Sequence, residues 1–80
     1  MKLPRGLSSP ELAKALSRVG YRITRQSGSH IRLTADMAEQ HHITIPAHDP
    51  LRIGTLAAIL GEVANHLELS REALVTTLFE

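Results

Sequence analysis

Histidine and arginine side chains gather in one stretch of the chain, where Arg22, Arg25 and Arg32 surround His30. An imidazole can accept or donate a proton near neutral pH, and a guanidinium binds phosphate oxygens. RNA supplies its own nucleophile, the 2′-hydroxyl, so a general base with cations beside it is sufficient to cleave RNA. His30 is therefore a candidate catalytic residue. The alternative is a structural or merely solvated histidine, which is the commoner role on a strand.

The other four histidines fit different roles. His41, His42 and His48 suggest a metal cluster, but adjacent residues on a strand point to opposite faces. The chain has no cysteine and its histidine spacing matches no zinc motif, so we expect neither a metal nor another cofactor. His48 can bind phosphate or act as a second acid, with loop capping as the alternative. His66 is placed to meet the negative end of a helix dipole.

The first element that must position these residues is a helix that begins in Ser8-Ser9-Pro10-Glu11. Ser9 as N-cap would place Pro10 at the first helical position, and this is the preferred interpretation. Ser8 as N-cap would instead form a capping box with Glu11. Gly20 suits the left-handed residue that ends the helix. The expected buried stripe consists of Leu12, Leu16 and Val19.

Three segments alternate between apolar and polar residues, at 21–26, 29–34 and 41–46, and Ser27-Gly28 marks the first turn. This period predicts an antiparallel sheet with one face against helices and one face toward solvent. The residues expected to face inward are Tyr21, Ile23, Ile31, Leu33, Ile43 and Ile45. Those expected to face outward are Arg22, Thr24, Gln26, His30, Arg32, Thr34, His42 and Thr44.

A second helix is predicted to open at Gly54-Thr55, with Thr55 as its N-cap, and Ser70 is predicted to cap a short last helix. The expected fold is α+β: a helix, three antiparallel strands and a helix that form an α-β-β-β-α sandwich, with a short extra C-terminal helix. The length predicts a single domain over residues 1–80.

Composition narrows the classes of function. Residues 1–34 hold seven basic residues against one acidic residue, or +6, whereas residues 35–80 hold two against seven, or −5. This division favours an anion-binding side built from the first half. One tyrosine, one phenylalanine and no tryptophan argue against a base-stacking platform. No apolar run approaches a membrane span and no signal peptide is apparent, so a cytoplasmic protein is expected.

Short motifs in a fixed order give the chain a family resemblance. They are Leu3-Pro4, Glu11-Leu12-x-x-Ala15-Leu16, Gly20-Tyr21, Arg25-Gln26-x-Gly28-Ser29-His30, Ile43-x-Ile45-Pro46-x-His48 and Gly54-Thr55-Leu56-x-x-Ile59-Leu60. The chain resembles HicA-type toxins, the small mRNA interferases of bacterial HicA–HicB toxin–antitoxin pairs. Each motif is weak alone, and their order and spacing together are fairly specific.

The resemblance implies a double-stranded-RNA-binding-like fold, metal-independent endoribonuclease activity on messenger RNA, and a HicB-like antitoxin that covers the catalytic face. It implies that the catalytic histidine is His30, in the segment Gly28-Ser29-His30. On this hypothesis the RNA-binding residues are Arg22, Arg25, Gly28, Ser29, Arg32 and His48.

Two alternatives remain open on the residues alone. The first is a non-catalytic RNA-binding or partner-docking module of the same fold, favoured by the small net charge and by Ala57, at a position where HicA-type toxins often carry a basic residue. The second is a structural subunit that needs its partner to fold, favoured by the small core that a chain of this length can bury.

Overall fold

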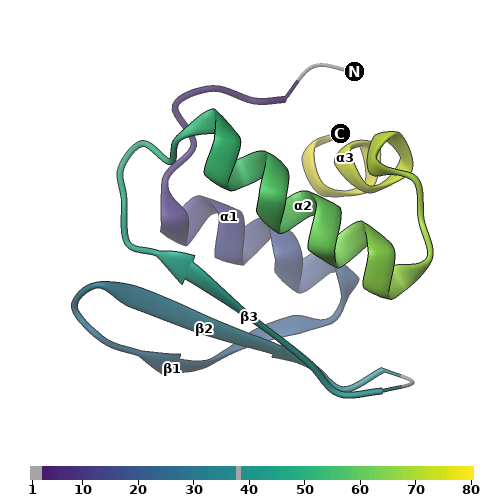
Figure 1. Ribbon diagram of the computed structural model, residues 1–80, viewed down its shortest axis with the longest axis horizontal. Helices are drawn as coiled ribbons and strands as arrows, with labels where there is room; N and C mark the ends of the chain where they lie inside the picture. The colour runs from purple at the N-terminus through teal and green to yellow at the C-terminus, as the bar shows by residue number, and fades with distance from the viewer. Residues whose placement is uncertain (1–2, 38) are drawn as a thin grey trace.

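The structure is a computed structural model that describes residues 3–37 and 39–80. Helix α1 (Ser9–Leu16) and a 3-10 turn (Ser17–Val19) precede strands β1 (Tyr21–Gln26), β2 (His30–Ala35) and β3 (His41–Pro46), and helices α2 (Ile53–Leu67) and α3 (Arg71–Phe79) follow. The helices lie on one side of the sheet, and the other side is left uncovered (Figure 1). We call these the inner and outer faces. The predicted α+β fold class is therefore confirmed.

Helix α1 begins one residue earlier than the preferred prediction. Its N-cap is Ser8, not Ser9. The Ser8 hydroxyl accepts a hydrogen bond from the Glu11 amide at 3.2 Å, and the Ser8 amide donates to the Glu11 carboxylate at 2.9 Å. This reciprocal capping box satisfies two amides at once, which explains why it prevails over Ser9. Gly20 adopts the predicted left-handed conformation, with φ of 93°.

The sheet has the order β1-β2-β3 with both strand pairs antiparallel. The inner positions of β2 and β3 are buried as predicted, with Ile31, Leu33, Ile43 and Ile45 at most 3% exposed. In β1 the register shifts between Ile23 and Arg25, so Thr24 is an extra residue opposite β2. Such a β-bulge reverses the alternation for the residues that follow it.

One predicted orientation in β1 is consequently wrong, and one residue predicted to lie in the core is exposed. Gln26 lies opposite the inward-facing Ile31, not on the outer face. Ile23 lies opposite the inward-facing Leu33 but is 51% exposed, because β1 is an edge strand that the helices cover incompletely. The bulge therefore separates a regular first half of the strand from a second half with the opposite orientation.

Helix α2 also begins earlier than predicted. Its N-cap is Arg52, without a side-chain cap, so Thr55 lies inside the first turn and is not the N-cap. Ser70 caps α3 as predicted, since its hydroxyl accepts from the Ala73 amide at 3.1 Å. No helix in the described part of the chain is long and apolar enough to cross a membrane. The completely buried core residues are Leu12, Leu16, Leu33, Ala35, Ile45, Leu60, Val63 and Leu74.

Candidate functional site

A hollow of about 240 Å³ lies at the end of the sheet where β1 turns into β2, and it collects most of the basic side chains of the strands. Its lining residues are Arg25, Ser27, His30, Arg32 and Thr44. No carboxylate is among them. A hollow of about 430 Å³ between residues 3–5 and α3 is larger but contains no histidine. The smaller hollow therefore has the donors that phosphate chemistry requires.

The bulge in β1 brings Arg25 into this hollow. Arg25 lies opposite Arg32, and Arg32 lies opposite Thr44 on β3, so the three side chains form a row on the outer face. Strict alternation from Tyr21 would have turned Arg25 toward the core. Bulges commonly redirect a side chain next to a functional site, and this one pairs two guanidinium groups without an intervening acid.

His30 is exposed at the start of β2, and its Nδ1 atom lies 2.9 Å from the Ser29 hydroxyl. Among the described residues, its Nε2 atom has no hydrogen-bond partner. The turn below the ring is closed by Ser27, whose amide donates to the His30 carbonyl at 2.9 Å and whose hydroxyl accepts from the His30 amide at 3.2 Å. The backbone of His30 is thus fixed, while one ring nitrogen stays available to a ligand.

Gly28 stands at the tip of this turn outside the left-handed region, and a Cβ atom added to it would meet nothing within 4 Å. The fold therefore does not require glycine at this position, whereas a close substrate approach would. His48 is exposed in the loop after β3, and its carbonyl accepts from the Ser9 amide at 3.2 Å. The neighbouring Ala47 amide donates to the Ser29 carbonyl at 2.8 Å, so this loop borders the same end of the sheet.

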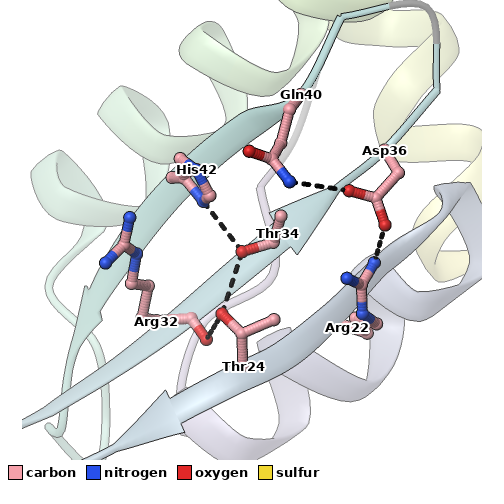
Figure 2. Close-up of polar contacts among 7 residues, drawn as sticks. All are labelled: Arg22, Thr24, Arg32, Thr34, Asp36, Gln40 and His42. Carbon is pink, nitrogen blue, oxygen red and sulfur yellow. Dashed lines mark hydrogen bonds and ion pairs between the residues drawn. The ribbon is translucent and has the colours of Figure 1, made fainter.

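Arg22 lies at the opposite end of the outer face, away from the hollow. Its guanidinium is paired with the Asp36 carboxylate, to which the Gln40 amide also donates at 3.0 Å (Figure 2). The hydrogen bonds from Gln40 and Arg22 lower the pKa of Asp36. The structure thus brings Arg25, Ser29, His30 and Arg32 together and leaves Arg22 in an ion pair.

Between these two ends, a chain of hydroxyl groups crosses the outer face (Figure 2). The Thr24 and Thr34 hydroxyl oxygens lie 2.8 Å apart, and the Thr34 hydroxyl lies 2.8 Å from Nδ1 of His42. Thr34 is only 2% exposed, although its side chain belongs to the uncovered face. Sequence reasoning placed all three residues outward and weighed His42 as a metal ligand, but it did not predict their mutual contacts, because these depend on the register and on the bulge.

His41 points the other way, into the inner face, as strand alternation predicts for adjacent histidines. Its Nδ1 lies 2.6 Å from the Tyr21 hydroxyl, its Nε2 lies 3.3 Å from the Glu62 carboxylate, and its ring stacks on His66 at 4.2 Å. Burial, with the nearby charge of Glu62, raises the pKa of Tyr21 to about 12. Both ring nitrogens of His41 are occupied by protein groups.

Comparison with protein families gives one match. The family model described as "HicA toxin of bacterial toxin-antitoxin" matches residues 9–64, from the start of α1 into α2. The chain belongs to the HicA toxin family. This membership identifies it as a toxin of the toxin–antitoxin type and implies an antitoxin partner. The predicted family is confirmed, and the match includes every residue that lines the hollow around His30. Comparisons with curated proteins and with solved structures found no match.

Proposed function

We propose that this HicA toxin is a metal-independent endoribonuclease that cleaves messenger RNA at the hollow around His30. The observation that carries the proposal is the exposed His30 ring, fixed at Nδ1 by Ser29 and flanked by guanidinium groups with no carboxylate in the hollow. Family membership supports a toxin whose target is essential to growth.

In the proposed reaction, the Ser29 hydroxyl accepts a hydrogen bond from Nδ1–H of His30, which leaves a lone pair on Nε2. Nε2 removes the proton from an RNA 2′-hydroxyl, and O2′ attacks the adjacent phosphorus. The P–O5′ bond then breaks, and the leaving O5′ takes a proton from protonated His30 or from water. The products are a 2′,3′-cyclic phosphate and a 5′-hydroxyl.

Arg25 and Arg32 take the role that a metal ion has in other nucleases. Their side chains lie opposite each other on the outer face, and guanidinium groups stabilise the charge that builds on the phosphorane oxygens. Gly28 has open space around it, so the RNA backbone can approach the turn closely. His48 and Arg22 would contact the RNA further from the cleaved bond.

A HicB-type antitoxin would inhibit the toxin by covering this same outer face. The face is not covered by any helix of the toxin, and its exposed groups are mostly cationic or neutral donors near the hollow. An acidic partner surface would therefore compete directly with RNA phosphates. Protection of Arg25 and Arg32 from an arginine-modifying reagent in the complex would locate the contact.

The test uses purified toxin with an RNA oligonucleotide and with the same oligonucleotide carrying 2′-deoxy sugars. We expect cleavage of RNA only, 2′,3′-cyclic phosphate ends, and unchanged activity in the presence of a chelator. Induction in a bacterial host should arrest growth for the wild type and not for His30→Ala. Equal growth arrest and RNA loss from both proteins would remove His30 from the mechanism. RNA binding without any cleavage would identify a non-catalytic module instead.

A further inference from the structure

A second imidazole lies on the same face as His30, at a site that the proposed reaction does not use. His42 is exposed on β3, and its Nδ1 is bonded to the Thr34 hydroxyl at 2.8 Å. Among the described residues, Nε2 of His42 has no hydrogen-bond partner. The arrangement repeats that of His30, where a hydroxyl also holds Nδ1 and leaves Nε2 available.

The direction of the hydroxyl chain determines what His42 can offer. Thr24 lies 2.8 Å from Thr34 and a longer 3.5 Å from the Arg32 carbonyl, so its hydrogen is better placed toward Thr34. Thr34 then donates its own hydrogen to Nδ1 of His42. This fixes the neutral ring with its hydrogen on Nε2, and the protonated ring also carries a hydrogen there. Nε2 of His42 is therefore a donor in both states.

The burial of Thr34 shows that this chain is a built feature of the outer face. Thr34 is 2% exposed, so an apolar residue of the same shape would keep the stability of the fold, whereas a buried hydroxyl without a hydrogen bond would lower it. Instead, Thr34 connects β1 to β3 through two hydrogen bonds. Thr24 and His42 are exposed at the two ends of this chain, and among the described residues Nε2 of His42 is left without a partner.

Arg32 links His42 to the hollow. It lies opposite Thr44, two residues along β3 from His42, and it also lines the hollow with His30. His30 lies opposite Pro46, four residues from His42, which corresponds to about 13 Å along the strand. A single strand of RNA covers that distance in about four nucleotides when stacked, at roughly 3.4 Å each, and in fewer when extended.

We propose that His42 binds a second RNA phosphate, a few nucleotides from the cleaved bond, through Nε2, and that Thr34 is the positioning residue for this contact. The inference rests on the proposed function, since it extends the RNA path from the hollow across the outer face. The RNA runs along β2 and β3 from His30 past Arg32 to His42. Arg22, paired with Asp36, lies in the same cross-strand row as Thr34 and His42, at the far end of this path.

The binding test uses a 2′-O-methyl RNA oligonucleotide of about 12 nucleotides, which spans both histidines and lacks the nucleophilic hydroxyl. We expect His42→Ala to weaken binding about tenfold, the scale of one hydrogen bond to a charged group. Thr34→Val keeps the side-chain shape and should lose a smaller part of that affinity. Lys14→Ala, which removes an exposed charge on α1, is the matched control and should change affinity less than about twofold.

The cleavage test compares a long RNA with a dinucleotide. His42→Ala should raise KM for the long RNA and leave kcat unchanged, while the dinucleotide, which cannot reach His42, should be cleaved equally by both proteins. Thermal melts confirm that each variant is folded. If His42→Ala bound RNA as tightly as Lys14→Ala, the role of His42 would be wrong; the proposed function would still stand as long as the wild type cleaved RNA. If the wild type did not cleave RNA but His42→Ala still bound it more weakly, the nuclease proposal would be wrong and the role of His42 would stand.

Discussion

The outer and inner faces of the sheet use the same side chain in opposite ways. On the outer face, His30 and His42 each have one ring nitrogen held by a hydroxyl and one that is unoccupied among the described residues. On the inner face, His41 has Nδ1 bonded to Tyr21, Nε2 paired with Glu62, and a ring stacked on His66. An imidazole with one anchored nitrogen can act on a ligand, whereas one with both nitrogens occupied holds structure together.

The two outer histidines differ in whether the hydroxyl that holds Nδ1 has a hydrogen-bond donor of its own. With Thr24 as the donor to Thr34, the Thr34 hydroxyl gives its own hydrogen to Nδ1 of His42, and Nε2 of His42 is then a donor. The Ser29 hydroxyl has no such donor among the described residues, so it can accept from His30 and leave Nε2 of His30 basic. The same ring is thereby suited to bind phosphate at one position and to remove a proton at the other.

The largest expected effect is the loss of RNA cleavage when His30 on the outer face is replaced. His30→Ala should lower the rate of RNA cleavage by about 10²- to 10⁴-fold, the typical contribution of a general base. The stability of the variant should stay within about 0.5 kcal/mol of the wild type, because the ring is exposed and no core contact is lost. Steady-state cleavage and urea unfolding measure the two quantities. A large loss of stability would show that His30 has a structural role instead.

A cooperative melt of the isolated wild type would argue against the alternative that the chain needs its partner to fold.

The converse effect is expected at His41. His41→Ala should destabilise the fold by about 1–3 kcal/mol, because the buried Tyr21 hydroxyl loses its partner and Glu62 loses its contact with Nε2. Cleavage per folded molecule should be unchanged. His66→Ala, which removes only the stacked ring, is the control and should cost less. Thermal unfolding equal for His41→Ala and His30→Ala would contradict the distinction between the two faces.

The sequence predicted the helices and strands better than the contacts between their side chains. Alternation of single residues located β3 at residues 41–46 and placed His41 and His42 on opposite faces, because side-chain period is a local property. Serine N-caps located the starts of α1 and α3, the former to within one residue. The start of α2 was missed because Arg52 is not a typical capping residue.

The bulge at Thr24 and the pairs Arg22–Asp36 and Tyr21–His41 were not predictable from local patterns. The bulge carries no glycine as a signal, and it is visible only once β1 is paired with β2. Each of the two pairs joins residues that the turns and the register bring together. Arg25 was predicted to bind RNA because it is an arginine, although the strand pattern alone would have turned its side chain inward.

A smaller effect would sharpen the picture of the outer face. Asp36→Asn removes the carboxylate that neutralises Arg22 and keeps an acceptor for Gln40. The released guanidinium should strengthen RNA binding about threefold, since a solvent-exposed ion pair is weak and competes only modestly with a phosphate. The matched control is Glu72→Gln, which removes an exposed charge on α3. Equal gains from both variants would show that net charge alone is responsible, and that Arg22 lies off the RNA path.

The smallest effect concerns the inner face and the single tyrosine of the chain. Because the chain has one tyrosine and no tryptophan, ultraviolet absorbance follows the ionisation of Tyr21 alone. The pKa should be about 12 in the folded protein and about 10 after denaturation. A raised pKa stabilises the fold below pH 10, and this contribution is lost as pH rises toward 12.

Two causes of that raised pKa can be separated with Glu62→Gln. Burial is the larger cause and the charge of Glu62 the smaller, so the variant should lower the midpoint only in part and leave it above the denatured value. The glutamine side chain has nearly the same shape, so it can keep the contact with His41 while the charge is removed. A midpoint that fell to the denatured value would mean that the inner face is wetter than its packing indicates. His41 would then resemble the outer histidines, and the contrast between the two faces would be lost.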